Sequence, residues 1–229
     1  MLSLCAGIAF FVGIHLLISG TRARDRLVAA IGEGPYQGLF SLASLAGIVW
    51  AVRAYNHAPY IETWGQVAAG RSLMIVLMAV AFVLFGVGVT TPGPTGTSVA
   101  ALERGEPPRG IHRITRHPFL WGAFLWALAH LIWNGDWASL VFFGGFAVLT
   151  LSGPISIDAK RARRHGEAWQ RYAEKSSNVP FGAVASGRAS LGADVLGEMG
   201  WWRIALALGL FVVALYGHTW AFGASPFPA

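Results

Sequence analysis

The sequence predicts an all-α integral membrane protein, a bundle of six transmembrane helices with both termini outside. Of its 229 residues, 55% are apolar and only 12% are charged, against about 25% charged residues in an average soluble domain. Six runs approach or reach the roughly 20 apolar residues that a helix needs to cross a bilayer. This composition argues against a soluble enzyme and a disordered chain, and the single cysteine, Cys5, argues against a disulfide scaffold.

The six runs predict where the chain crosses the membrane. We expect spans at residues 2–20, 36–54, 72–91, 119–133, 137–157 and 204–222. Gly and Pro gather between spans, at 91–96 and 105–108, where a helix has to stop. No basic segment precedes the first run, so we expect a permanent span rather than a cleaved signal peptide. The whole chain, 1–229, is expected to form one domain with a cytoplasmic segment over 158–203.

Lysine and arginine predict the orientation. The loops after the first, third and fifth spans hold 15 of the 17 Lys and Arg residues, and only Arg53 and Arg71 lie on the other side. Cytoplasmic loops carry the excess of positive charge. We therefore expect these three loops in the cytoplasm and both termini outside.

The basic loops have two readings. The first is adhesion to anionic lipid at the cytoplasmic face, and the second is a site for an anionic substrate or cofactor. Because the basic residues are spread between apolar runs, we expect no nucleic acid as partner. Residues 158–175 are expected to be helical, and the apolar side chains further on are expected to lie on the membrane; they are Leu191, Val195, Leu196 and Met199.

Three histidines fall inside predicted spans, where an ionisable side chain is costly and calls for a structural or functional reason. At 1.5 Å per residue, His15 lies about 10 Å, His130 about 18 Å and His218 about 22 Å from the inner boundary. His117 lies at the inner end of the fourth span. The remaining ones, His57, His112 and His165, are expected in solvated loops.

The intramembrane histidines leave several chemistries open. They could hydrogen-bond neighbouring helices, ligate a metal or haem, or relay protons, although no span carries a carboxylate for a relay. Two opposed imidazoles, His15 and His130, suit haem b in a slot lined by small and aromatic residues such as Trp126. Their depths differ by about 8 Å, so the haem would have to tilt, and His218 is the substitute ligand. The absence of a Cys-x-x-Cys-His motif excludes covalent c-type haem.

Several segments together resemble the NnrU family of bacterial membrane proteins. They are GIHRITRHP at 110–118, LAHLIW at 128–133, HLLISG at 15–20, VPF at 179–181 and HTWAFG at 218–223. The resemblance covers essentially the whole chain. It implies an association with denitrification, through nitrite or nitric oxide reduction, in the bacterial inner membrane.

The family also includes a plant integral membrane haem b enzyme, 15-cis-zeta-carotene isomerase. The resemblance therefore implies that His15 and His130 are axial ligands, with Arg116 and His117 at the cytoplasmic mouth near the haem propionates. The activity implied is redox-gated cis–trans isomerisation of an apolar polyene, or handling of a nitrogen oxide at iron. The plant enzyme has a cysteine three residues before its second ligand, where this chain has Ala127, so a cysteine-based switch does not carry over.

Two alternatives stand beside the haem reading. The chain could be a non-enzymatic membrane component that supports denitrification, with histidines that serve packing alone. Arg116-His117-Pro118 with Gly122 also resembles membrane methyltransferases that bind S-adenosylmethionine near the cytoplasmic ends of their last helices. The comparable segment here, 156–161, carries one carboxylate in place of a Glu-Glu pair.

Overall fold

A computed structural model describes residues 1–67, 70–95 and 99–227. Within these ranges the chain is helical, without a β-strand, and its one isolated β-bridge joins Glu62 to Asp136. Its internal contacts divide it into two compact units. Unit 1 comprises residues 1–67 and 127–156, and unit 2 comprises 68–126 and 157–229.

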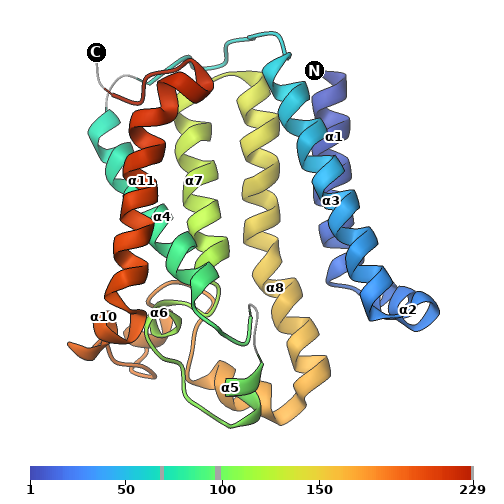
Figure 1. Cartoon of the computed structure of the whole chain (residues 1–229), viewed down its shortest axis with the longest axis vertical. Helices are drawn as coiled ribbons and strands as arrows, with labels where there is room; N and C mark the ends of the chain where they lie inside the picture. The colour runs from blue at the N-terminus through green and yellow to red at the C-terminus, as the bar shows by residue number, and fades with distance from the viewer. Residues whose placement is uncertain (68–69, 96–98, 228–229) are drawn as a thin grey trace. The chain divides into compact units, whose positions relative to one another are not determined.

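Unit 1 contains the N-terminal helices (Figure 1). α1 spans Leu2–Gly13 and continues as a short π-helix, η1, over Ile14–Ser19, and α2 (Arg22–Ile31) leads to α3 (Glu33–Asn56). Unit 1 also takes the end of α7 (Pro118–Asn134) and the first half of α8 (Trp137–Glu174). Both of these helices therefore run from one unit into the other.

Unit 2 holds the remaining elements. Its long helices are α4 (Arg71–Thr90) and α11 (Trp201–Phe222). Its short helices are α5 (Ala100–Glu103), α6 (Ile111–Ile114), α9 (Gly182–Ala185) and α10 (Asp194–Met199).

Five helical segments are long and apolar enough to cross a membrane: Leu2–Ser19, α3, α4, α8 and α11. The prediction of an all-α protein with several membrane-spanning helices is confirmed to that extent. α7 is nearly as apolar but has 17 residues, so a sixth span stays a prediction, as do the orientation and the single domain. The predicted ends lie within about three residues of the observed ones, except in α8.

α8 is longer than its predicted span. The sequence predicts a span that ends at 157 and a helical, basic stretch over 158–175. The helical run continues from one into the other as far as Glu174 and consists of two helices that meet at a kink at Gly166. Pro154 does not end it, although proline removes one helical hydrogen bond. The backbone leaves helical geometry only at Gly166, with φ +48°, a conformation that glycine adopts without a steric penalty.

Glycines bring the helices of unit 1 into close contact. A Cβ on Gly7 would lie 3.2 Å from the Ala51 backbone of α3, and one on Gly145 would lie 2.3 Å from Ile8 of α1. α2 is fixed to α3 by Arg24, which is buried, pairs with Glu33 and lies over the Tyr36 ring at 5.2 Å.

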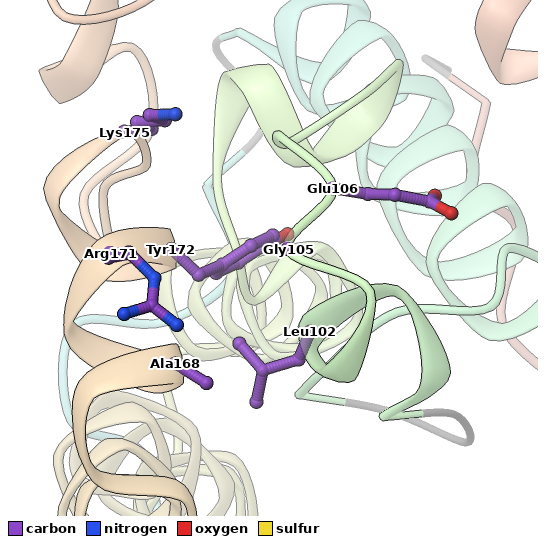
Figure 2. Close-up of a pocket in the computed structure, with 7 residues that line it drawn as sticks. All are labelled: Leu102, Gly105, Glu106, Ala168, Arg171, Tyr172 and Lys175. Atoms are coloured by element: carbon purple, nitrogen blue, oxygen red, sulfur yellow. The ribbon is translucent and has the colours of Figure 1, made fainter.

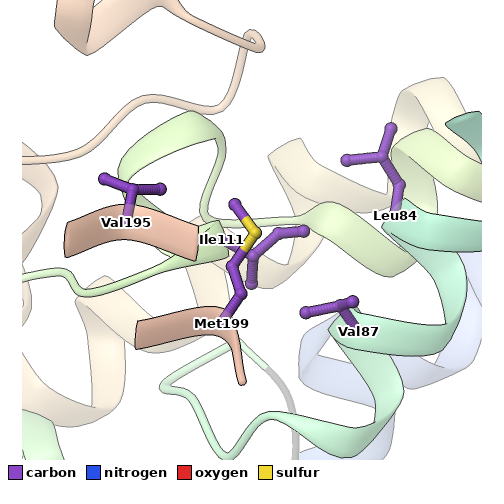
Figure 3. Packing of buried hydrophobic residues seen from close by; sticks show 5 residues of the cluster. All are labelled: Leu84, Val87, Ile111, Val195 and Met199. Atoms are coloured by element: carbon purple, nitrogen blue, oxygen red, sulfur yellow. The ribbon is translucent and has the colours of Figure 1, made fainter. Parts of the chain in front are cut away.

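An apolar cluster holds together the short helices of unit 2. It consists of five buried side chains from α4, α6 and α10 (Figure 3), which are Leu84, Val87, Ile111, Val195 and Met199. The expectation that Val195 and Met199 lie on the membrane is therefore wrong for these two. They face other helices, whereas Leu191 and Leu196 are 43% and 48% exposed.

Candidate functional site

His15 lies in the π-helix, which the sequence did not predict. Its Nδ1 is 2.7 Å from the carbonyl oxygen of Phe11. Because a carbonyl can only accept, Nδ1 carries the hydrogen and Nε2 keeps its lone pair. Nε2 makes no hydrogen bond within the described part of the chain. π-helical turns inside α-helices are frequent at functional sites, so this geometry favours a ligand role over simple packing.

A continuous series of aromatic side chains joins His15 to His130 within unit 1. The His15 ring lies 4.5 Å from Phe11, and Phe11 lies 5.5 Å from Phe146 of α8. Phe146 contacts Phe142 at 5.2 Å, Phe142 contacts Phe143 at 5.1 Å, and Phe143 stacks on His130 at 4.8 Å. The sequence did not predict that these three α8 phenylalanines connect the histidines, because a phenylalanine in a span is ordinarily a lipid-facing or core side chain.

Both histidines are only partly buried. Phe40 of α3 adds an edge-on contact to His15 at 5.1 Å. Phe143 lies nearly parallel to the His130 ring, at an interplanar angle of 21°. Both imidazoles therefore pack against phenylalanine rings.

Backbone hydrogen bonds join the segment after α3 to the junction of α7 and α8 in unit 1. Residues 61–67 bond to 132–137: the amides of Thr63 and Gly65 donate to the Gly135 carbonyl at 2.9 and 3.1 Å, and Trp137 donates to Ile61 at 2.9 Å. Gly135 has φ +59°, and a Cβ there would lie 2.0 Å from the Gly65 carbonyl oxygen. The close approach of these two segments depends on glycine at 135.

Arg116 and His117 form a compact ion cluster in unit 2. Arg116 donates from Nε and Nη2 to Oδ2 of Asp158, at 2.9 and 2.5 Å. His117 donates from Nε2 to Oδ1 of the same carboxylate, at 2.7 Å. Burial lowers the pKa of His117, although the Asp158 carboxylate opposes that shift. Asp158 thus accepts hydrogen bonds from both Arg116 and His117, which the sequence placed at the cytoplasmic end of the haem site. The sequence did not predict Asp158 as their partner.

Two family segments meet at this cluster. The amide of Arg116 donates to the Ser177 carbonyl at 2.9 Å, and Phe181 donates to the Ile114 carbonyl at 2.8 Å. Asn178 accepts through its carbonyl from the Thr115 hydroxyl at 2.6 Å and from the Trp121 indole at 2.8 Å. The 110–118 and 179–181 motifs, about 60 residues apart in sequence, therefore hold each other in one structure.

His112 is buried, contrary to its expected place in a solvated loop. Its exposed fraction is 6%, and neither ring nitrogen has a hydrogen-bond partner among the residues that the structure describes. Burial, with a smaller contribution from His117, lowers its pKa to about 4. The ring lies directly against Gly93, where a Cβ would come within 2.3 Å of Nε2.

The remaining predicted residues lie in unit 2. His218 is near the end of α11, with Nδ1 2.8 Å from the Ala224 carbonyl oxygen. Trp126 is the last residue of unit 2 before α7 enters unit 1. A cavity of about 40 Å³ also lies in unit 2, between α5 and the end of α8 (Figure 2). Its lining includes Leu102, Tyr172 and Arg171, and none of the predicted site residues.

The residues of unit 1 fit haem better than a simple metal ion. Among the described residues, no group of three His, Cys, Asp or Glu side chains could hold a metal. Haem needs only axial ligands, because the macrocycle supplies the other four. His15 offers an uncommitted Nε2, and a backbone bond from the other ring nitrogen is the usual way in which a protein orients a ligating histidine. Arg116 and His117 do not fit a propionate-binding role while Asp158 holds them.

Comparison with known proteins gives two kinds of similarity. The family described as NnrU protein matches residues 3–226. The chain is 34% identical to 15-cis-zeta-carotene isomerase, chloroplastic, of Arabidopsis thaliana over 116 residues, 51% of the chain and 32% of that relative. It is 36% identical to the Zea mays protein of the same name over 85 residues, 37% of the chain and 23% of that relative. No solved structure matches.

The chain therefore spans a third or less of the length of these curated relatives in the regions it shares with them. The family match, in contrast, extends over almost every residue from the first helix to the end of α11. On that match, the chain belongs to the NnrU family.

Proposed function

We propose that the protein is a haem b membrane protein that isomerises double bonds of an apolar polyene, with His15 and His130 as the two axial ligands. One observation carries the proposal: the unbroken series of ring contacts from His15 to His130, all within unit 1. An aromatic, apolar surrounding suits both a macrocycle and a long hydrocarbon substrate. The similarity to 15-cis-zeta-carotene isomerase supports the reaction class.

The role of the chain's own residues would be to orient the two ligating histidines. The Phe11 carbonyl holds the His15 imidazole in the tautomer that presents a lone pair at Nε2. Phe143 fixes the plane of His130 by stacking. The backbone hydrogen bonds between 61–67 and 132–137 would hold in place the end of α7 that follows His130. When bound, haem would supply an iron centre whose oxidation state gates isomerisation of the polyene.

The topology belongs to the same proposal. We infer six spans, with α7 as the sixth, both termini outside and the basic loops in the cytoplasm at an anionic lipid surface. α7 supports this inference because its 17 residues lie at the lower limit for a span. Residence in a bacterial inner membrane rests on membership of the NnrU family.

Two other functions remain as alternatives. The first is a role in denitrification, which membership of the NnrU family also supports. In that role the iron would bind a nitrogen oxide, or the protein would support a reductase without catalysis. A methyltransferase would need Arg116 free to bind its cofactor's carboxylate, and Asp158 already accepts two hydrogen bonds from that guanidinium. The geometry therefore favours the haem reading over methyl transfer.

An optical spectrum of the purified protein tests the cofactor. We expect a Soret band, with sharp α and β bands after dithionite reduction. Colourless protein after expression with added haem precursor would contradict the haem proposal and favour a non-enzymatic component.

An isomerisation assay tests the reaction. Haem-loaded protein in lipid discs should convert 15-cis-zeta-carotene faster in one oxidation state of the iron than in the other. His57→Ala is the matched control, because His57 is exposed and its ring bonds only its own helix, at the Arg53 carbonyl. Haem-loaded protein that leaves the polyene unchanged in both states, yet binds nitric oxide, would move the function to nitrogen oxides.

A further inference from the structure

A hydrogen-bonded polar cluster adjoins His130 in the otherwise aromatic interior of unit 1. It consists of Tyr55 from α3, Asn134 from α7, Asp136 at the start of α8 and Ser139 from α8. Asp136 and Ser139 are 7% and 0% exposed. Asn134 lies one helical turn after His130 and therefore on the same face of α7. Neither the family resemblance nor the proposed ligand set accounts for this cluster.

The chemistry of the donor and acceptor groups fixes the direction of each hydrogen bond. The Ser139 amide donates to Oδ1 of Asp136 at 2.9 Å, and the Ser139 hydroxyl donates to Oδ2 at 2.6 Å. With that hydrogen used, the Ser139 oxygen can only accept, so the Tyr55 hydroxyl donates to it at 2.9 Å. The Asn134 amide donates to Ser139 at 3.0 Å and to Tyr55 at 3.2 Å. Each of these bonds has a defined donor and acceptor, so the cluster has one arrangement.

Part of the cluster has a plain structural role. Asp136 precedes α8 and accepts from the amide three residues on, which is an ordinary helix N-cap. That role needs neither Tyr55 nor Asn134, which come from two other helices. Their bonds to Ser139 tie α3, α7 and α8 together at one point.

The cluster reaches His130 through two rings. The Tyr55 ring lies 4.9 Å from Phe142 and edge-on to Phe143 at 5.7 Å. Phe143 in turn stacks on His130 at 4.8 Å. A phenol fixed at its hydroxyl and packed along its ring limits how far Phe143 can rotate. Phe143 then limits the plane that the His130 imidazole can adopt.

We propose that Tyr55 is the positioning residue for His130, held by Ser139, Asn134 and Asp136, and that this cluster sets the orientation of the imidazole toward iron. The inference rests on the proposed haem function and goes beyond it, because the residues concerned are not ligands. Groups behind a ligating histidine fix its ring orientation and its donor strength, and their loss commonly weakens binding by about 10- to 100-fold.

The test compares Tyr55→Phe and Ser139→Ala with the wild type. Ferric protein is studied by electron paramagnetic resonance and by redox titration of the optical spectrum. We expect both variants to keep haem but to show a changed low-spin signal, a high-spin fraction, and about a tenfold change in the ferric-to-ferrous ratio at fixed potential, which equals 59 mV for one electron. Ser139→Thr keeps the hydroxyl and should therefore show the low-spin signal of the wild type.

Tyr60→Phe is the matched control, because Tyr60 is exposed and, within the described ranges, its hydroxyl hydrogen-bonds only to Glu62, at 3.4 Å. It should leave signal and potential unchanged. If Tyr55→Phe and Ser139→Ala lower thermal stability but leave the spectra of haem-loaded protein unchanged, the cluster is only a helix clamp and the inference is overturned. A wild type that binds no haem would overturn the proposed function and this inference together.

Discussion

The two units differ in the partners of one histidine each, His15 in unit 1 and His117 in unit 2. In unit 1 the His15 ring bonds one backbone carbonyl and otherwise meets aromatic rings, and its second nitrogen makes no hydrogen bond among the described residues. In unit 2 His117 shares the Asp158 carboxylate with Arg116. An imidazole whose partner is an ionised carboxylate beside an arginine is already committed, so the unit 2 cluster fastens the fold. His15 differs in keeping one ring nitrogen that makes no hydrogen bond within the described part of the chain.

The largest effect should come from breaking the unit 2 cluster. Asp158→Asn leaves Arg116 buried without its counter-charge, and removing one partner of a buried pair costs about 3–5 kcal/mol. The side chains of Arg116 and Asp158 are 14% and 19% exposed. We expect a large fall in the temperature midpoint of unfolding in detergent. The haem spectrum of the folded protein, which depends on His15 and His130 of unit 1, should not change.

Glu167→Gln is the control for this change. It breaks the exposed Arg171–Glu167 pair on the same helix, whose side chains are 63% and 87% exposed. Surface pairs of this kind contribute about 0–1 kcal/mol. Equal effects of the two substitutions would contradict the fastening role of Asp158.

A pair of adjacent glycines tests the packing around the unit 1 histidines. Gly145→Ala would place a methyl group 2.3 Å from Ile8, and overpacking of this kind costs about 1–3 kcal/mol. Gly144→Ala meets only Leu131 at 3.6 Å, an ordinary contact, so it should gain up to about 1 kcal/mol of helix propensity. Thermal unfolding of the two variants should shift in opposite directions, and a shift of both in the same direction would argue against the α1–α8 contact.

The buried His112 predicts a pH dependence of stability. Its pKa is about 4 in the folded protein and near 6.5 when unfolded. Between these values the unfolded chain binds more protons, so stability should fall as pH drops from about 6.5 to about 4, by at most about 1.4 kcal/mol per pH unit. His112→Leu should reduce this slope and cost little at pH 8, because the substitution breaks no hydrogen bond to any of the described residues. An unchanged slope, measured by denaturant unfolding, would contradict the burial of His112.

Much of the helical layout could be predicted from the sequence, because a membrane requires long apolar runs and those runs are visible. Most helix ends could be predicted from the charged residues and the Gly and Pro residues that lie between the apolar runs. The π-helix at His15 could not be predicted, since its hydrogen-bond shift depends on packing and has no residue signature in Ile14–Ser19. The continuation of the helix past 157 was missed because the predicted span was ended where the apolar run gives way to Asp158 and the basic residues after it, and a helix can continue beyond an apolar run.

The site was predicted in part. The histidines within spans stood out because ionisable groups are rare there. The partner of Arg116 and His117 could not be predicted, because Asp158 is about 40 residues away in sequence and only the tertiary fold brings the three residues together. The burial of His112 follows from its contact with Gly93, a tertiary feature as well. Tyr55 and Ser139 are common residue types whose pairing, 84 positions apart, leaves no local pattern.

The haem content of matched histidine variants tests the contrast between the units most directly. His15→Ala and His130→Ala from unit 1 would be purified beside His117→Ala and His112→Leu from unit 2, and the haem-to-protein ratio of each measured from the reduced spectrum. We predict loss of the low-spin spectrum in both unit 1 variants and wild-type haem content in folded unit 2 variants. Full haem content in His130→Ala, or its loss only in the unit 2 variants, would contradict the account.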